Sequence, residues 1–349
     1  MISNRSPIDI SRSEGCTLTG VLSVTGFLDD AVTVIHGPSG CTHHNASLLY
    51  ASLAEIDSFD LPRFISSNVL EEDVIFGGED ALLRAIDAAE ALNPALISVV
   101  STCIADTIGD DTAAVCRKPR EIPVVYIPGS GFLGGGFSEG IKNALLSLIS
   151  FSPKTASSPE EGVMIVGEKN LEYEADENFD EVSRLISLLG LHTGLRFVRR
   201  MPAPACRRIS SAPLAVLRDP SLEPVGSALR ERFGTPIISG FPIGPDGTLN
   251  FLRSLGESAG IDSLPAIRDE EGHLEDLYDT FSDLSGLSVT FDPKSANPGS
   301  ADVAESMIQV LGMKKTASGH LLPLPYDPPV GTAGTKRMLH AWRRSLSRA

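Results

Sequence analysis

The alternation of short β-branched segments with helical segments is the feature that most constrains the fold of this chain. Strands are predicted at 31–37, 95–102 and 122–129, and helices at about 41–53, 80–93, 106–118 and 137–149. A chain that repeats strand and helix in this way forms a parallel sheet with helices on both faces. The sequence therefore predicts an α/β fold, with ligands bound outside the carboxyl ends of the strands.

A segment rich in Ser and Pro, FSPKTASSPEEG at 151–162, is predicted to be a linker between two alternating blocks. The second block begins with the strand of VMIVGEKN and ends with TPIISGFPIG. From about residue 260, one strand (GLSVTF) and one helix (SADVAESMIQVLG) are predicted before a closing helix, AGTKRMLHAWRRSL. We expect Rossmann-like domains at 1–150 and 163–258, and a small third α/β unit with the closing helix at 259–349.

The charge and the N-terminus argue against several classes of protein. The chain has 29 Lys and Arg against 45 Asp and Glu, a formal net charge of −16. Nucleic-acid binding needs a basic face, so we expect no nucleic-acid partner. The sequence MISNRSPIDISRSEG has no apolar signal region, and no stretch approaches the roughly 18 apolar residues of a membrane span. We expect a cytoplasmic protein that does not contact a membrane.

The five cysteines divide into two groups. An isolated cysteine is most often a small core residue, and Cys116 and Cys206 are expected to be of this kind. Cys16, Cys41 and Cys103 lie instead in turn-forming settings, GCTLTG, HGPSGC and STCIADTIGDD. They are 25 and 62 residues apart, too far for the paired knuckles of a zinc ribbon. Three thiolates from separate loops fit an iron–sulfur cluster whose fourth ligand comes from elsewhere.

The order and spacing of these motifs resemble the nitrogenase component 1 family. The resemblance rests on GCTLTGVLSVTGFLDDAVTVIHGPSGC, EEDVIFGGEDALLRAI and STCIADTIGDD, and it continues through PGSGFLGGGFSEGIKNAL, VMIVGEKN and FPIGPDGTLNFL. It covers most of residues 14 to 260 and implies two to three Rossmann-like parallel-sheet domains, the third reduced in size. It also implies that Cys16, Cys41 and Cys103 hold a 4Fe-4S cluster near a subunit interface.

The resemblance further implies an enzyme that depends on a partner. The chain lacks the GxxxxGKS or GxxxxGKT loop, so a separate homodimeric P-loop iron–sulfur reductase would supply electrons with ATP. The compact form most closely resembles the homodimeric catalytic component of the nickel-sirohydrochlorin a,c-diamide reductive cyclase of coenzyme F430 synthesis. Its substrate would be a nickel tetrapyrrole. Val216 stands where nitrogenase α chains hold their large cofactor through a cysteine. The alternative is a non-catalytic scaffold for metallocluster assembly.

Several polar residues near the cysteines are candidates for proton supply and for the fourth ligand. His36, His43 and His44 surround Cys41 and are candidate proton donors or axial metal contacts. The alternative is a His36 that caps its loop and two histidines on a helix surface. Asp29 and Asp30 are candidates for an oxygen ligand, from this chain or a partner, because an aspartate takes that place in the protochlorophyllide reductases.

Glycines and arginines provide the candidate substrate site. GSGFLG at 129–134 satisfies G-x-G-x-x-G, but it follows a late strand and lacks the acidic residue of a dinucleotide site. The resemblance instead implies that this loop faces a substrate cavity, with Gly131, Gly134 and Gly135 beside the substrate. Arginines in an acidic chain either form a solvated face or bind carboxylates of the substrate. The arginines proposed to bind them are Arg207, Arg208 and Arg218.

Overall fold

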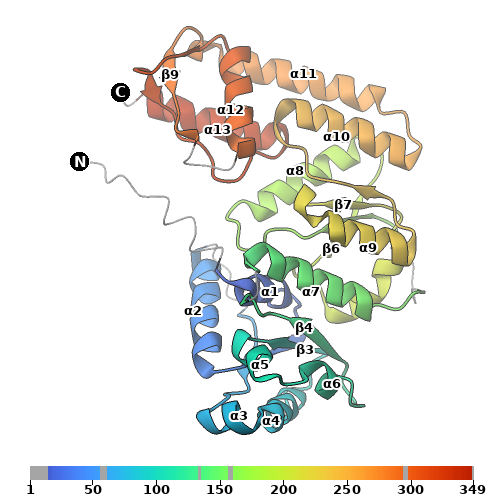
Figure 1. The fold of residues 1–349 in the computed structure, drawn as a ribbon. Helices are drawn as coiled ribbons and strands as arrows, with labels where there is room; N and C mark the ends of the chain where they lie inside the picture. The colour runs from blue at the N-terminus through green and yellow to red at the C-terminus, as the bar shows by residue number, and fades with distance from the viewer. Residues whose placement is uncertain (1–14, 56–60, 133–134, 156–159, 294–297, 348–349) are drawn as a thin grey trace. The chain divides into compact units, whose positions relative to one another are not determined.

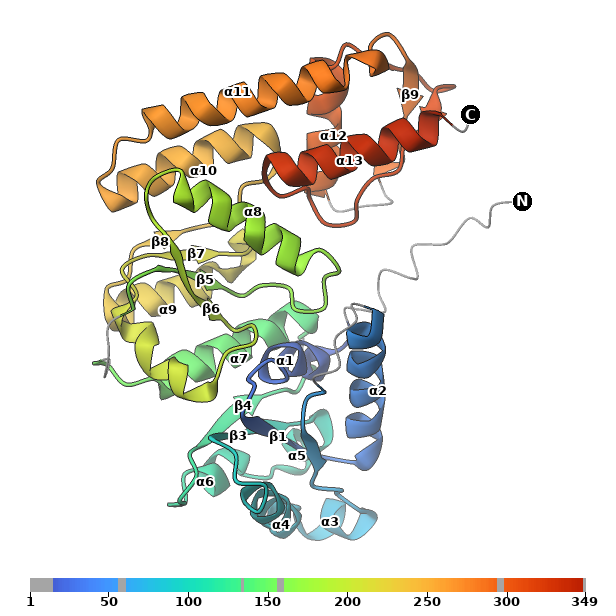
Figure 2. The same cartoon turned by 180° about the vertical axis from the view of Figure 1, so that it is seen from behind.

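The computed structural model describes residues 15–55, 61–132, 135–155, 160–293 and 298–347. Its elements form two compact units (Figure 1, Figure 2). Met1–Ala175 and Gly194–Ser239 form the first unit, and Asp176–Thr193 and Gly240–Ala349 form the second. Within the described residues, none of the helices combines the length and the apolar character needed to cross a bilayer.

The first sheet of unit 1 is parallel, with the strand order β2-β1-β3-β4. Side chains along β1 alternate between the two faces of the sheet. On one face, Val32 and Val34 pack in a core with α4 and α6. On the other face, Ala31 and Ile35 pack in a core with α1 and α7. Both faces are therefore covered by helices, as the sequence predicts. The elements of this half are α1 (Thr17–Thr25), β1 (Ala31–His36), α2 (Ser39–Glu55), β2 (Phe64–Ser66), α3 (Glu71–Phe76), α4 (Glu79–Glu90), β3 (Leu96–Ser101), α5 (Cys103–Ile108), α6 (Thr112–Cys116), β4 (Val124–Pro128) and α7 (Phe137–Phe151).

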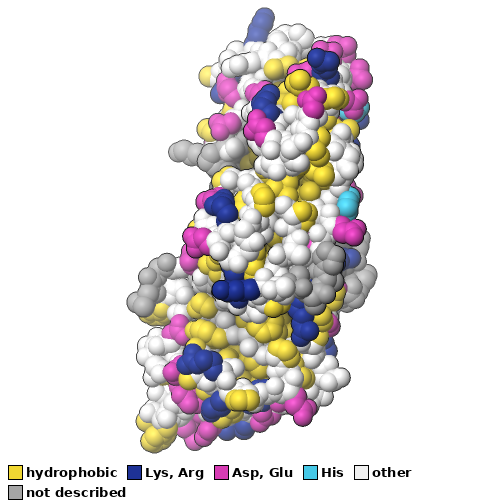
Figure 3. Space-filling model, turned by 90° about the vertical axis from the view of Figure 1, so that its right-hand side faces the viewer, with side chains coloured by type: hydrophobic (Ala, Val, Ile, Leu, Met, Phe, Trp, Pro, Cys, Tyr) yellow, Lys and Arg dark blue, Asp and Glu magenta, His cyan; other side chains and the backbone are white. Residues whose placement is uncertain are grey.

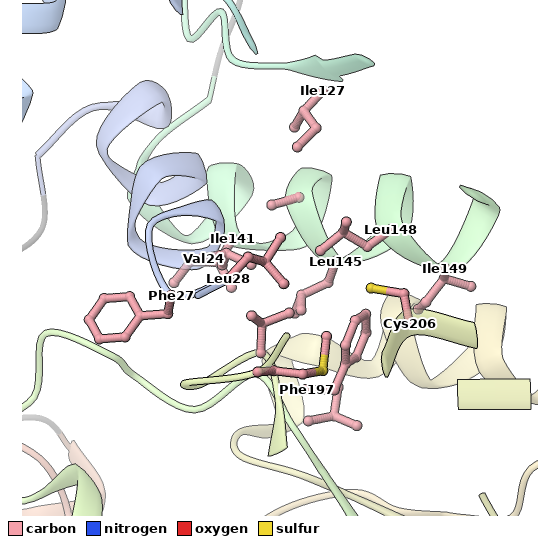
Figure 4. Close-up of a cluster of buried hydrophobic side chains, with 14 of the residues drawn as sticks. Val24, Phe27, Leu28, Ile127, Ile141, Leu145, Leu148, Ile149, Phe197 and Cys206 are labelled. Atoms are coloured by element: carbon pink, nitrogen blue, oxygen red, sulfur yellow. The ribbon is translucent and has the colours of Figure 1, made fainter. Parts of the chain in front are cut away.

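The second sheet of unit 1 has the order β6-β5-β7-β8, and α7 packs between the two sheets. Figure 4 shows Ile127 of β4 on one side of α7, and Phe197 and Cys206 on the other. Leu145 and Leu148 of α7 are fully buried among them. The elements of this half are β5 (Val163–Val166), β6 (Thr193–Phe197), η2 (Ala203–Ser211), β7 (Ala215–Leu217), η3 (Pro220–Leu222), α9 (Glu223–Phe233) and β8 (Ile237–Ile238).

Unit 2 is mainly helical and has its own core around Trp342 and Phe281, both fully buried. Arg184 donates paired hydrogen bonds at 2.8–2.9 Å to the buried carboxylates of Glu181 and Glu270. A small parallel sheet has the order β10-β9-β11. The elements are α8 (Ala175–Ser187), α10 (Gly244–Ala259), α11 (Leu264–Thr280), η4 (Ser282–Leu284), β9 (Ser288–Thr290), α12 (Pro298–Val310), β10 (Lys314–Lys315), β11 (His320–Leu321) and α13 (Gly331–Leu346).

Each of the three sheets lies within one of the domains expected from the sequence, at 1–150, 163–258 and 259–349. The compact units group the first two sheets together, and the boundaries of the three domains stay a prediction. The single helix predicted at 106–118 is wrong. Gly109 adopts a left-handed conformation (φ 82°) that ends α5, and Asp111 begins α6 by accepting a hydrogen bond from the Ala114 amide at 2.8 Å.

Candidate metal centre

The carboxyl ends of three neighbouring strands lead into the segments that carry the predicted site. β1 ends at His36 and is followed by α2, whose first turn contains Cys41. β3 ends at Ser101, and α5 begins at Cys103. β4 ends at Pro128, before the glycine loop. Because β1, β3 and β4 are adjacent and parallel, these segments share one edge of the first sheet.

Helix α1 brings Cys16 to the same edge. Cys16 is the N-cap of α1, and the next residue, Thr17, lies against the glycine loop. A Cβ added at Gly131 or Gly135 would lie 2.5 or 2.9 Å from Thr17 Oγ1. A Cβ at Gly140 of α7 would lie only 2.0 Å from the Thr17 carbonyl oxygen. Glycines therefore permit the close approach that fixes the start of α1 beside the ends of the strands.

A chain of hydrogen bonds links the Cys16 segment to the Cys41 segment. The Cys16 amide donates to Thr19 Oγ1 at 3.2 Å, and that hydroxyl donates to Asn45 Oδ1 at 2.6 Å. Asn45 Nδ2 in turn donates to the Cys41 carbonyl oxygen at 2.8 Å. Thr19 and Asn45 are buried, so this link is shielded from water. Neither residue was predicted from the sequence, although Thr19 has capping-box spacing from Cys16 and Asn45 lies one turn after Cys41.

The Cys41 thiol is close enough to the other two sulfur atoms for them to affect its pKa. Burial raises the pKa of the Cys41 thiol, and the nearby sulfurs of Cys16 and Cys103 raise it further. By contrast, burial raises the pKa of Cys116 and of Cys206 to about 12, and the nearby charges that act on these two thiols come from Arg117 and Arg120 and from Asp30, respectively. The convergence of three thiols from separate loops fits an iron–sulfur cluster, in which each thiolate binds a different iron. In the described ranges, no group of three or more His, Cys, Asp or Glu side chains is placed closely enough to hold a single metal ion.

His36 lies at the end of β1, is fully buried and has both ring nitrogens engaged. Nδ1 lies 2.9 Å from Ser67 Oγ, and Nε2 lies 2.9 Å from Asp110 Oδ2. Asp110 also accepts a hydrogen bond from the Gly78 amide at 2.9 Å. Burial lowers the pKa of His36 despite the opposing effect of the Asp110 carboxylate. This environment favours the structural role that the sequence left open for His36.

The other candidate histidines and the two aspartates lie in different places. His43 and His44 are exposed in the first turns of α2, so their proposed proton supply stays a prediction. Asp29 and Asp30 precede β1 and therefore lie at the amino edge of the first sheet, where Asp30 Oδ1 accepts from the Ala203 amide at 2.6 Å. The expectation that either aspartate is the fourth ligand within this chain is wrong, because the length of β1 separates them from Cys41.

The candidate substrate residues do not form one group. Gly131 and Gly135 lie at the cysteine edge against Thr17, whereas Gly134 falls outside the described residues. Arg218 follows β7, is 4% exposed and donates to Glu172 at 3.0 and 3.1 Å, at the carboxyl edge of the second sheet.

Arg207 and Arg208 belong to η2, which enters β7 from its amino end. Arg208 pairs at 3.1 Å with Glu160, which precedes β5. Arg207 and Arg208 therefore lie toward the opposite edge of the second sheet from Arg218, and their proposed contact with substrate carboxylates stays a prediction. On the face drawn in Figure 3, basic and acidic side chains are interspersed and do not form a patch of one sign.

Comparisons with known proteins identify the family. The model of the nitrogenase component 1 type oxidoreductases matches residues 16–314. The nitrogenase iron-molybdenum cofactor biosynthesis protein NifE of Clostridium pasteurianum is 30% identical over 283 residues, which are 77% of this chain and 60% of that protein. The nitrogenase molybdenum-iron protein alpha chain of Methanococcus maripaludis is 25% identical over 338 residues, which are 90% of this chain and 70% of that protein.

A solved structure agrees with the sequence relatives. Nitrogenase Cp1 at pH 5 matches with a TM-score of 0.66 and 23% identity, over 87% of this chain and 63% of that chain. This match confirms the predicted nitrogenase component 1-like α/β fold. The chain spans about three fifths of the length of NifE and of Cp1. Since the family match includes all three converging cysteines and most of the sequence, the chain belongs to the nitrogenase component 1 type oxidoreductases.

Proposed function

We propose that this chain is the catalytic component of a nitrogenase-like reductase that acts on a nickel tetrapyrrole, most specifically in the reductive cyclisation of nickel-sirohydrochlorin a,c-diamide. The observation that carries the proposal is the convergence of Cys16, Cys41 and Cys103 at one edge of the first sheet. Their thiolates would hold a 4Fe-4S cluster. When bound, such a cluster accepts and donates single electrons.

The protein's part is to position the three ligands. Cys16 and Cys103 lie at the start of α1 and α5, and Cys41 lies in the first turn of α2. Backbone amides at the start of a helix are free of intrahelical partners and favour nearby negative charge, so they stabilise thiolates. The Thr19–Asn45 link fixes the spacing of two ligand segments.

Features of the second sheet support an organic substrate instead of a large inorganic cofactor. Val216 is fully buried within β7, between its partners Ile165 and Ile238, and it supplies no thiolate. Arg218, at the carboxyl end of the same strand, is the arginine suited to a substrate carboxylate. It already binds Glu172, so a substrate carboxylate would have to compete with that side chain.

Exposed apolar side chains near the cysteine edge support a protein partner. Val74, Ile75 and Phe76 of α3 are 48, 74 and 87% exposed, and α3 packs against α5, which begins at Cys103. Clustered exposed apolar side chains are typical of interaction sites. We propose a P-loop ATP-dependent iron–sulfur reductase as electron donor and a second copy of this chain as a partner in a homodimer.

The alternative function is a scaffold that holds a metallocluster during its assembly. The 30% identity to NifE, a cofactor biosynthesis protein, favours this alternative. The burial of Val216 counts against it, because an assembly site needs a ligand for its cargo.

Titration of the purified protein with nickel-sirohydrochlorin a,c-diamide distinguishes the two functions. We expect the absorption of the pigment to shift on binding. Arg218→Ala should weaken binding at least tenfold because it removes the cation. Glu172→Gln is the matched control and should strengthen binding, since it removes the competing carboxylate. Equal affinity in Arg218→Ala would contradict the role of Arg218, and a parent protein that binds no tetrapyrrole would favour the scaffold.

A further inference from the structure

Each of the three converging cysteines has a threonine as its immediate neighbour in the sequence. Thr17 follows Cys16, Thr42 follows Cys41, and Thr102 precedes Cys103. The hydroxyl oxygens of all three threonines are buried, and none has a hydrogen-bond partner within the described part of the chain. Buried hydroxyls are normally hydrogen-bonded. Other hydroxyls, such as those of Thr25 and Thr112, are also unpartnered, but Thr17, Thr42 and Thr102 are set apart because each adjoins one of the three converging thiols.

The local structure shows that these hydroxyls are not used in the ways usual for threonine. Thr102 is the N-cap of α5, where its hydroxyl would normally accept from an amide of the first turn, yet it makes no such bond. A Cβ at Gly37 would lie 2.1 Å from Thr102 Oγ1, and one at Gly131 would lie 2.5 Å from Thr17 Oγ1. Glycines of the neighbouring loops thus leave room for both hydroxyls at the cysteine edge.

We propose that the hydroxyls of Thr17, Thr42 and Thr102 donate hydrogen bonds to the sulfur atoms of the iron–sulfur cluster, an inference that rests on the proposed function. A hydroxyl donates one hydrogen bond and rotates freely to do so, and cluster sulfurs are weak acceptors that carry negative charge. Cluster binding would then satisfy the three buried hydroxyls together. These threonines are positioning residues, since the cysteines bind the iron.

The proposal predicts a change in reduction potential. Hydrogen bonds to sulfur stabilise the more negative, reduced state of the cluster, so their removal shifts the midpoint potential to more negative values. Valine keeps the shape of threonine but lacks the hydroxyl. Serine keeps the hydroxyl but lacks the methyl group.

The test uses the cluster-loaded protein and its Thr17→Val, Thr42→Val and Thr102→Val variants. Iron and sulfide are assayed first, and the midpoint potential is then measured by redox titration with an EPR readout. Each valine variant should keep its iron and show a more negative midpoint potential, and the triple variant should show the largest shift. The Thr→Ser variants should keep the potential of the parent.

Thr25→Val is the matched control. Thr25 is also buried with an unpartnered hydroxyl, but it lies at the other end of α1. The midpoint potential of the cluster in the Thr25→Val variant should equal that of the parent. Loaded valine variants with the potential of the parent would overturn this inference alone. The inference would also be overturned if the Thr→Ser variants, which keep the hydroxyl, showed a more negative midpoint potential than the parent. This second comparison keeps the test valid if a valine variant fails to fold. A parent protein that binds no iron would overturn the proposed function itself.

Discussion

At the residue scale, Cys41 and Cys206 show how two cysteines of one chain acquire different chemistry. Cys206 is 1% exposed in the apolar core beside α7, and burial raises its pKa to about 12. It is therefore an inert thiol. Cys41 is partly exposed in the first turn of a helix and lies near two other sulfurs. A thiol in that setting becomes a thiolate when a metal binds, with release of a proton.

Substitution of the cysteines tests this distinction directly. Cys16→Ser, Cys41→Ser and Cys103→Ser should each remove the iron–sulfur cluster, because each variant loses one of three thiolate ligands. Cys206→Ser should keep its iron, although the hydroxyl in an apolar core should lower thermal stability. The measurement is iron and sulfide analysis with an absorption spectrum after anaerobic purification. Full iron occupancy in Cys103→Ser would contradict the ligand assignment.

At the element scale, α1 determines where Cys16 lies, yet nothing in the sequence marked TLTGVLSVT as a helix. Its threonines and valines favour strands, and Gly20 lies in its middle. All nine residues are buried, so no polar face gives it a helical period. Tertiary packing against α7 overrides the local preference. A Cβ at Gly20 would lie 1.9 Å from the Phe137 carbonyl oxygen, so the two backbones are in contact.

Gly140→Ala should therefore disturb both the fold and the metal centre. Its Cβ would lie 2.0 Å from the Thr17 carbonyl oxygen and would push α1 away from α7. Overpacking of this kind costs about 1–3 kcal/mol, which in a chain of 349 residues predicts a melting temperature lower by roughly 1 to 4 °C. Iron content should fall as well, since Cys16 begins α1.

Gly272→Ala provides the control for that substitution. Gly272 is exposed in α11, no atom lies within 4 Å of the added Cβ, and alanine should be neutral or slightly stabilising there. Differential scanning calorimetry and iron analysis compare the two variants. A Gly140→Ala protein that melts with the parent would mean that the contact between α1 and α7 relaxes without cost.

The sequence predicted those elements whose local preferences agree with their burial. The runs that became β1, β3 and β4 are apolar and β-branched, and so the edge shared by Cys41 and Cys103 followed from topology. Helix α11 was missed because its surface is strongly acidic, although Pro265 in its first turn is typical of a helix start and Ile267, Leu274 and Leu277 recur at helical spacing. The position of Asp30 at the opposite edge from Cys41 was also missed, because proximity in sequence does not give proximity in space.

At the scale of the whole molecule, three thiolates do not complete a four-iron cluster. Cys16 is exposed at the cysteine edge. Asp29 and Asp30 come directly before β1 and therefore lie at the opposite edge of the sheet. Helix α3 exposes Phe76 and Ile75 beside the same edge. An exposed cluster would be open to oxygen and water. These features are explained together if another protein covers the edge.

We therefore expect the cluster-loaded protein to be a homodimer whose interface shelters the cysteine edge. Light scattering coupled to size-exclusion chromatography should give the mass of two chains, and the iron-free Cys103→Ser variant should shift toward the monomer because its interface lacks the cluster. Cys206→Ser, which keeps the cluster, is the control and should remain dimeric.

Phe76→Ser then separates the two proposed partners. If α3 belongs to the dimer interface, this variant dissociates. If α3 binds the reductase, the dimer persists and only reductase-dependent reduction of the cluster is lost. A monomer that carries a stable, solvent-shielded cluster would contradict the homodimer, since one chain would then have supplied all the protection that the cluster needs.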